Sequence, residues 1–155
     1  MKLIFIMFLL SIFVGPWAQA LCVSANKANL RTGPGTKFQL SWAVGKYTPF
    51  VGIRRKGVWW QVKDQDGKKH WVHKSLVSRR TKCVGISRDR ANVRIGPGTK
   101  FSKHSLGHIG RYNGVKILKS KGDWLNVADA FGERYWLHSS VTWRPLRAIK
   151  LNYSR

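Results

Sequence analysis

The sequence is poor in acidic residues, in cysteine and in stretches with helical spacing. Only six Asp and Glu residues stand among its 155 residues, which leaves little for the paired carboxylates of glycoside hydrolysis. The two cysteines have no second cysteine or histidine at metal-ligand spacing. No stretch repeats its apolar residues with sustained helical spacing. The sequence therefore predicts an all-β chain without a cofactor or a metal site.

Long apolar runs are scarce too, and the one at the start is short. Residues 3–14 form an apolar run of 12 residues behind Lys2, whereas a helix needs about 20 residues to span a bilayer. Ala18-Gln19-Ala20 fits the small-residue rule for signal cleavage. The pattern predicts a signal peptide over residues 1–20. The product, exported to the periplasm or secreted, is expected to begin near Leu21 without a transmembrane segment.

Basic residues, in contrast, are abundant and spread along the whole chain. Residues 21–80 carry 13 basic and 2 acidic side chains, residues 81–143 carry 11 and 4, and the tail 144–155 carries 4 and none. A field of this sign attracts anionic partners. Behind a signal peptide we expect an anionic cell-envelope polymer, with peptidoglycan first, and nucleic acid only adventitiously. The alternative is that the charge merely confers solubility.

A repeat organises the chain. Residues 28–38 and 91–101 are 63 positions apart and agree at nine of eleven positions, so one supersecondary unit has been duplicated. Each copy reads as a short strand that enters a tight Gly-Pro-Gly loop, in which proline presets φ and glycine accepts positive φ. The two cysteines, Cys22 and Cys83, precede these copies at nearly matching positions.

The repeat continues at an offset of 65, through the segments around Trp59-Trp60 and Trp124-Leu125. Short β-rich runs alternate with Lys-Gly and Asp-x-x-Gly turn signals. The pattern predicts five or so strands in each half and a small barrel from each. The expected domains are residues 21–80 and 81–143, followed by a basic tail over 144–155.

Both halves resemble the bacterial SH3 (SH3b) domain. The pattern Ala-Asn-Val-Arg-x-Gly-Pro-Gly-Thr-x-Phe, then Gly-x-Trp-x-x-Val, then Gly-x-x-x-Trp-Val/Leu-His runs twice through nearly all of residues 22–143. The chain is most similar to exported tandem SH3b proteins that start with a cysteine. The resemblance implies two SH3-like β-barrels that serve in cell-wall targeting or peptide binding. SH3b domains often sit beside a peptidase, amidase or lysin domain, and none is expected in this chain.

An even cysteine count in an exported protein favours a disulfide between Cys22 and Cys83. Such a bridge would link the opening strands of the two repeats. In the chain-entropy model it contributes about 4 kcal/mol to stability. Two buried, unpaired thiols are the alternative.

Candidate functional residues are few. His73 and His138 are expected to bond to backbone at strand ends, and no Ser-His-Asp set can be assembled from the sequence. Trp71 and Trp136 are expected in the cores. Because Trp59 and its neighbour Trp60 point to opposite faces of a strand, one of the two rings is expected to face outward. Trp59 aligns with Trp124, which leaves Trp60 as the extra aromatic. The candidate ligand-binding residues are Trp60, Tyr47, Tyr112, Arg31 and Arg94.

For Arg31 and Arg94 a local role, covering a strand face, is the alternative. For the outward tryptophan the alternative is packing between the barrels. Together these observations predict an exported, non-enzymatic module that binds an anionic envelope component, most plausibly peptidoglycan. The alternative is a scaffold or a secreted effector that binds a protein partner.

Overall fold

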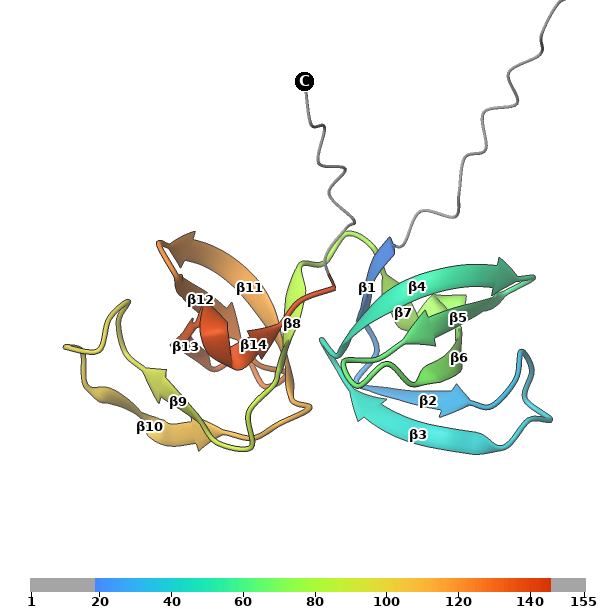
Figure 1. Cartoon of the computed structure of the whole chain (residues 1–155), viewed down its shortest axis with the longest axis horizontal. Helices are drawn as coiled ribbons and strands as arrows, with labels where there is room; N and C mark the ends of the chain where they lie inside the picture. The colour runs from blue at the N-terminus through green and yellow to red at the C-terminus, as the bar shows by residue number, and fades with distance from the viewer. Residues whose placement is uncertain (1–18, 146–155) are drawn as a thin grey trace, which may run out of the picture.

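The computed structural model describes residues 19–145, which form two curled antiparallel sheets joined in tandem (Figure 1). The expected all-β fold of two SH3-like units is confirmed. The predicted signal peptide lies outside the described residues except for Gln19 and Ala20. These two residues open the first strand and pair with Gly52 and Val51. The tail is described only to Pro145.

The first sheet has seven strands in the order β3-β2-β6-β5-β4-β1-β7, so β3 and β7 remain as its two edges. A single 3-10 turn, η1 (Lys74–Leu76), precedes the last strand. The strands are β1 (Gln19–Val23), β2 (Lys27–Arg31), β3 (Leu40–Gly45), β4 (Pro49–Lys56), β5 (Trp59–Lys63), β6 (Lys69–His73) and β7 (Val77–Ser78).

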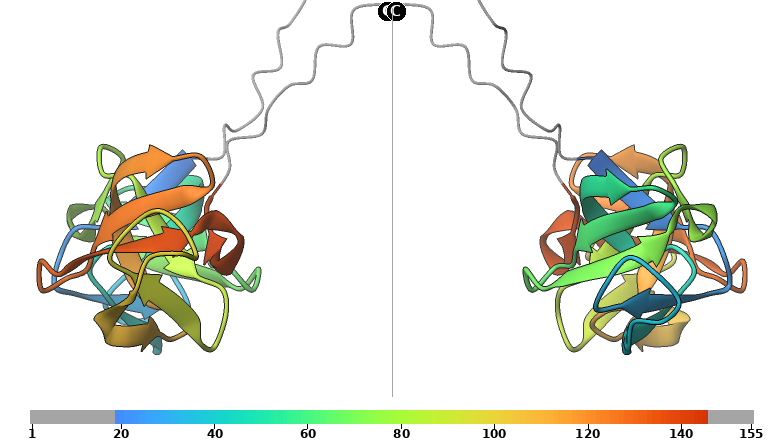
Figure 2. Two further views of the ribbon diagram at one scale, coloured as in Figure 1. Left: turned by 90° about the vertical axis from the view of Figure 1, so that its left-hand side faces the viewer. Right: turned by 90° about the vertical axis from the view of Figure 1, so that its right-hand side faces the viewer.

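The second sheet repeats this order as β10-β9-β13-β12-β11-β8-β14. The turn η2 (Ser139–Val141) takes the place of η1. Seen from its own end, each unit wraps its strands around a common centre (Figure 2). The strands are β8 (Cys83–Ile86), β9 (Ala91–Arg94), β10 (Lys103–Ile109), β11 (Gly114–Lys121), β12 (Trp124–Ala128), β13 (Arg134–His138) and β14 (Thr142–Trp143).

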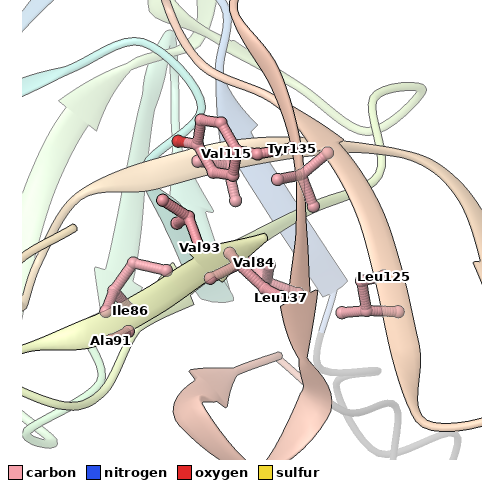
Figure 3. Close-up of a cluster of buried hydrophobic side chains, with 9 residues drawn as sticks. Val84, Ile86, Ala91, Val93, Val115, Leu125, Tyr135 and Leu137 are labelled. Carbon is pink, nitrogen blue, oxygen red and sulfur yellow. The ribbon is translucent and has the colours of Figure 1, made fainter. Parts of the chain in front are cut away.

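Each barrel has its own small apolar core, built from alternate strand residues. In the second barrel Val84, Val93, Val115 and Leu137 are fully buried and form one cluster with Tyr135 (Figure 3). The first core is equivalent, with Phe50 at the place of Val115. A unit of about 60 residues buries little apolar surface, so contacts outside these cores matter for stability.

The predicted hairpin turns are confirmed. Gly57 and Gly122 have φ of 58° and 55°, between β4 and β5 and between β11 and β12. In the next turn Asp64 Oδ1 accepts the backbone N–H groups of Asp66 and Lys68, at 3.0 and 2.8 Å. Asp129 holds the equivalent turn of the second barrel in the same way.

The Gly-Pro-Gly loops form as predicted, but for a different reason. Neither Gly33 nor Gly96 has a positive φ. Instead the ring of Phe38 lies directly over Gly33, and Phe101 lies over Gly96, so a Cβ at either glycine would clash with the ring. The glycines are needed for close approach, and each loop is closed by its own phenylalanine.

The predicted disulfide between Cys22 and Cys83 is confirmed, with the two Cα atoms 6.1 Å apart. It joins β1 to β8 but does not join equivalent positions. In the strand register Cys22 lies opposite Pro49, and Cys83 lies opposite Lys116. The counterpart of Pro49 in the second barrel is Gly114, two residues before Lys116. The bridge is therefore an asymmetric link between two similar barrels.

The barrels also touch directly beside the disulfide. Gly114 of β11 lies against the backbone of Tyr47 and Thr48, leaving no room for a Cβ. On the neighbouring strand β8, a Cβ at Gly85 would come within 3.2 Å of Pro49. Only residues 79–82 separate β7 from β8, so the two barrels are held close together along the chain as well.

The tryptophans predicted to fill the cores do not do so. Trp71 is buried, at 6% exposure, but it does not belong to the first core cluster. Trp136 is only partly buried. Val72 and Leu137, one position later, face the cores instead, because successive strand residues point to opposite faces. The prediction is therefore wrong for Trp136, whereas for Trp71 it holds for burial but not for a place in the core cluster.

Within residues 19–145 no helix is long and apolar enough to cross a membrane. The same residues contain no cluster of three or more His, Cys, Asp or Glu side chains placed to hold a metal ion.

We predict that Gly114→Ala lowers the stability of the chain. Its Cβ would press on the backbone of Tyr47 and Thr48, and overpacking of this kind costs about 1–3 kcal/mol. Gly45→Ala is the matched control, because a Cβ there meets nothing within 4 Å. Thermal unfolding of both variants measures the difference. Equal midpoints would show that the barrels do not press together at this point.

Candidate functional site: two cation–aromatic rows

A row of four side chains crosses the outer face of the first sheet. Arg31 of β2 lies opposite Trp71 of β6, Trp71 lies opposite Gln61 of β5, and Gln61 lies opposite Arg54 of β4. The Arg54 guanidinium carbon is 5.3 Å from the Trp71 ring centroid, and Arg54 Nε donates to Gln61 Oε1 at 2.7 Å. A tryptophan therefore lies between two cations, with an amide beside it.

The second barrel carries the same row. Arg94 lies opposite Trp136, Trp136 opposite Asn126, and Asn126 opposite Lys119. Lys119 Nζ lies 5.7 Å from the Trp136 ring centroid. Arg54 has become Lys119 and Gln61 has become Asn126, so charge and polarity are retained at each place. We refer to these two sets as the cation–aromatic rows.

The predicted residues Arg31 and Arg94 stand at one end of each row and also brace the loops. Arg31 Nη1 donates to the Phe38 carbonyl at 2.8 Å, and Arg94 Nη1 donates to the Phe101 carbonyl at 2.7 Å. The local role considered for these arginines is thus present. A guanidinium has further donors beyond the one used here, so bracing leaves capacity for a ligand.

Trp60 is placed away from the rows. It packs partly against the first core and carries Arg55 over its ring at 5.4 Å. Its neighbour Trp59 lies on the other face against His73, with the ring centroids 5.4 Å apart. Trp59 is thus the outward ring of the Trp59-Trp60 pair, and Trp124 is its counterpart in the second barrel. The assignment of Trp60 to a ligand stays a prediction.

Tyr47 and Tyr112 occupy equivalent turns, both with left-handed φ, at 67° and 68°. Tyr112 lies at the barrel contact, where its hydroxyl donates to Asp66 Oδ2 at 2.7 Å. Arg111 Nη2 donates to the other oxygen of Asp66 at 2.8 Å. The Tyr112 ring also meets Trp42 edge-on at 5.6 Å. The five predicted ligand residues are therefore distributed over several places.

These two donors act on the ionisation of Asp66. The hydrogen bond from Tyr112 and the charge of Arg111 hold the pKa of the Asp66 carboxyl below its ordinary value. The same hydrogen bond raises the pKa of the Tyr112 hydroxyl. The contact is therefore strongest when Asp66 is ionised and Tyr112 is protonated.

The structure assembles one polar set that sequence reasoning missed. Ser41 Oγ lies 2.9 Å from His70 Nδ1, and His70 Nε2 lies 3.2 Å from Asp64 Oδ2. Because a carboxylate only accepts, the proton is on Nε2 and the lone pair of Nδ1 faces the serine hydroxyl. No spacing in the sequence predicts this set, because its members come from β3, the β5–β6 turn and β6. The second barrel has Tyr135 in place of His70.

His73 and His138 act as predicted. Each caps its 3-10 turn, with Nδ1 accepting the backbone N–H of Ser75 or Ser140 at 3.3 Å. The same nitrogen lies 2.7 Å from the serine hydroxyl. Their repetition in both barrels reflects the shared fold.

Comparison with known families identifies the first barrel. Residues 24–79 match the family model described as Bacterial SH3 domain, which bears out the predicted resemblance for the first barrel.

One curated relative is the "Putative N-acetylmuramoyl-L-alanine amidase YrvJ" of Bacillus subtilis (strain 168), 20% identical over 131 residues. The alignment covers 78% of this chain but only 23% of that protein. The chain therefore spans about a quarter of this relative.

Similar solved structures include NlpC2 from Trichomonas vaginalis, with 11% identity and a TM-score of 0.36. That match covers 81% of this chain and 48% of NlpC2. An NlpC/P60 family protein from Bacillus cereus ATCC 10987 matches with 12% identity and a TM-score of 0.39, over 81% of this chain and 57% of that protein.

The curated relative corrects the prediction that the chain is not an enzyme, because that relative is named as an amidase. The prediction rested on the absence of a sequence-visible catalytic set, and such a set depends on spatial neighbours rather than spacing. The Ser41–His70–Asp64 contact shows that spacing along the chain can miss a polar set.

We predict that acid weakens the barrel contact through Asp66. Its pKa is lowered in the folded chain, so the stability it adds is present above its ordinary pKa and is lost as the pH falls through the lowered value. Asp66→Asn should flatten the pH dependence of the unfolding free energy below about pH 4. Asp123→Asn, another exposed acid, is the control. A wild-type slope in Asp66→Asn would contradict this assignment.

Proposed function

We propose that the chain binds peptidoglycan outside the cytoplasm, and that the cation–aromatic rows make the contact. The observation that supports this proposal is the retention of both rows in register through the duplication, with Arg54 and Lys119 placed over Trp71 and Trp136. The match to the bacterial SH3 family and the relative named as an amidase of N-acetylmuramoyl-L-alanine support the same ligand. The disulfide supports an oxidising location.

The chemistry of the rows suits a wall polymer. Acidic groups of wall peptides would pair with the cations, which the tryptophans hold in place. Trp71 is buried beneath Arg54, so only the partly exposed Trp136 would offer apolar surface to a sugar or peptide segment. A single row of this kind binds weakly, because exposed ion pairs contribute only about 0–1 kcal/mol each. Two linked rows on one polymer raise the effective affinity without any new contact.

The test is retention on purified sacculi at about 50 mM and about 500 mM salt. The wild type should be retained at low salt and released at high salt. Arg54→Gln combined with Lys119→Gln should lower retention by about tenfold or more, a loss of about 1.4 kcal/mol. Lys27→Gln combined with Lys82→Gln removes the same charge away from the rows.

Two results would count against the proposal. No retention of the wild type at low salt would reject wall binding. Equal loss in the row variant and in the control variant would show that only net charge matters. Saturable binding to a protein that survives digestion of the wall would favour the interaction scaffold considered from the sequence.

A second candidate function is hydrolysis at Ser41. The polar set supplies an exposed serine, a base and an orienting carboxylate. Ser41 Oγ would form a bond to a carbonyl carbon while its proton passes to His70 Nδ1. That proton would then go to the leaving group, and water would release the acyl chain from the serine.

We predict that a fluorophosphonate probe labels Ser41 if this candidate holds, which intact-mass measurement would detect. Ser41→Ala should abolish labelling. Ser75→Ala is the matched control, because Ser75 also bonds a histidine Nδ1 but that histidine, His73, has no carboxylate partner within the described chain. An unlabelled wild type, or labelling that persists in Ser41→Ala, would dismiss the candidate.

A further inference from the structure

A hollow of about 350 Å³ opens in the first barrel between β5, η1 and β7. This volume lies in the range of about 300–1,000 Å³ that small-molecule sites occupy. Trp60 forms its apolar wall together with Leu21 and Val77, and the remaining lining residues are Arg55, Lys74, Ser75 and Arg79. The hollow lies on the other face of the sheet from the cation–aromatic row. Arg55 and Trp60 follow and precede Arg54 and Gln61 in their strands, and successive strand residues point to opposite faces.

The lining has one sign of charge. Arg55, Lys74 and Arg79 are all exposed, and no acidic residue borders the hollow. Arg55 lies 5.4 Å from the Trp60 ring centroid, so a cation and an aromatic face are held side by side. Three cations around a small hollow attract an anionic group, while an exposed indole offers a stacking surface.

Trp60 occupies a place where the fold requires only a small apolar side chain. Its counterpart in the second barrel is Leu125, which is 4% exposed and completes the core there. The register is the same, since Arg55 pairs with Trp60 and Ser120 pairs with Leu125. The larger ring in the first barrel is only partly buried, and its surplus surface lines the hollow.

The cations have diverged in the same way. Arg55 corresponds to Ser120, and Lys74, which opens η1, corresponds to Ser139, which opens η2. Tryptophan and two cations are thus present together in the first barrel and absent together from the equivalent place in the second. A purely structural role would have been served equally well by the leucine and the two serines.

We propose that this hollow binds a sugar unit that carries a carboxylate, with the ring on Trp60 and the carboxylate on Arg55 and Lys74. The proposal rests on the proposed peptidoglycan function, within which it names a second contact: the carboxylate of an N-acetylmuramic acid unit, which is free where the amide bond to the stem peptide has been cleaved. Size favours a single sugar over a polymer segment, and the adjacent cation and aromatic face favour a ligand with one anionic and one apolar side.

The test is an NMR titration of the disulfide-bonded full chain with N-acetylmuramic acid, D-glucuronic acid and N-acetylglucosamine, observed at the indole N–H groups. The two acids should shift the Trp60 signal saturably, and the neutral sugar should bind about tenfold more weakly or not at all. Stronger binding of N-acetylmuramic acid than of glucuronic acid would assign the source to the wall, and equal binding would assign it to sugar acids in general.

Two variants and two controls complete the experiment. Trp60→Leu installs the residue of the second barrel and also removes the indole signal, so its titration is followed at the backbone N–H groups of Arg55 and Ser75, where the saturable shifts should be lost. Arg55→Gln with Lys74→Gln leaves the core untouched and should weaken binding of the acids about tenfold. Trp59→Leu removes the neighbouring ring on the other face, and the Lys27→Gln, Lys82→Gln pair removes equal charge elsewhere; neither should matter.

The inference is overturned if neither acid shifts Trp60, or if Trp60→Leu and the Arg55, Lys74 double variant both bind as the wild type does. Retention on sacculi is measured on the same samples. If the wild type is not retained on sacculi at low salt but shows a normal sugar titration, the role of the rows is rejected while sugar binding in the hollow stands. The two proposals therefore fail separately.

Discussion

The contact between the two barrels is the constraint on which the rest of the structure depends. Each barrel has its own core of nine or eight buried residues, and the disulfide joins the barrels at their opening strands. Beside it, Gly114 lies against the backbone of Tyr47, and Asp66 of the first barrel is bound by Arg111 and Tyr112 of the second. A covalent link, a close backbone approach and a charge-assisted pair therefore act at one interface, which sets how the two cation–aromatic rows lie relative to each other.

Duplication followed by divergence explains the distribution of chemistry. The parts needed by the fold occur twice: the phenylalanine that closes each glycine loop, the aspartate that holds each tight turn, and the histidine that caps each 3-10 turn. The rows also occur twice, with only conservative changes. Three features occur once, in the first barrel: the hollow at Trp60, the Ser41–His70–Asp64 set, and the acidic partner Asp66. Single-copy features are where the two halves can differ in function.

The fold was largely predictable because its signals are local. Turn glycines such as Gly57, the paired motifs and the strand alternation all lie within a few residues of one another. The cores were less predictable from the sequence. Alternation alone cannot say which face of a strand is inside, and Trp71, which was expected in the core, lies on the outer face beside Arg54. The glycine loops formed as expected, although the reason at Gly33 is the Phe38 ring rather than its φ.

The candidate site was predictable only in fragments. Arg31 could be singled out from its repetition, but its alignment with Trp71, Gln61 and Arg54 depends on the register of four strands. His70 is not repeated, because Tyr135 stands at the equivalent place of the second barrel. Bonds to Ser41 and Asp64 appear only when the sheet is folded. Long-range register is information that spacing along one chain does not carry.

Residual dipolar couplings of the disulfide-bonded chain in solution test the central claim most directly. If the interface makes the two barrels one rigid body, couplings from residues 21–78 and from residues 83–143 will fit a single alignment tensor in the arrangement of Figure 1. Two tensors of different magnitude or orientation would show that the barrels move independently, and would contradict the account.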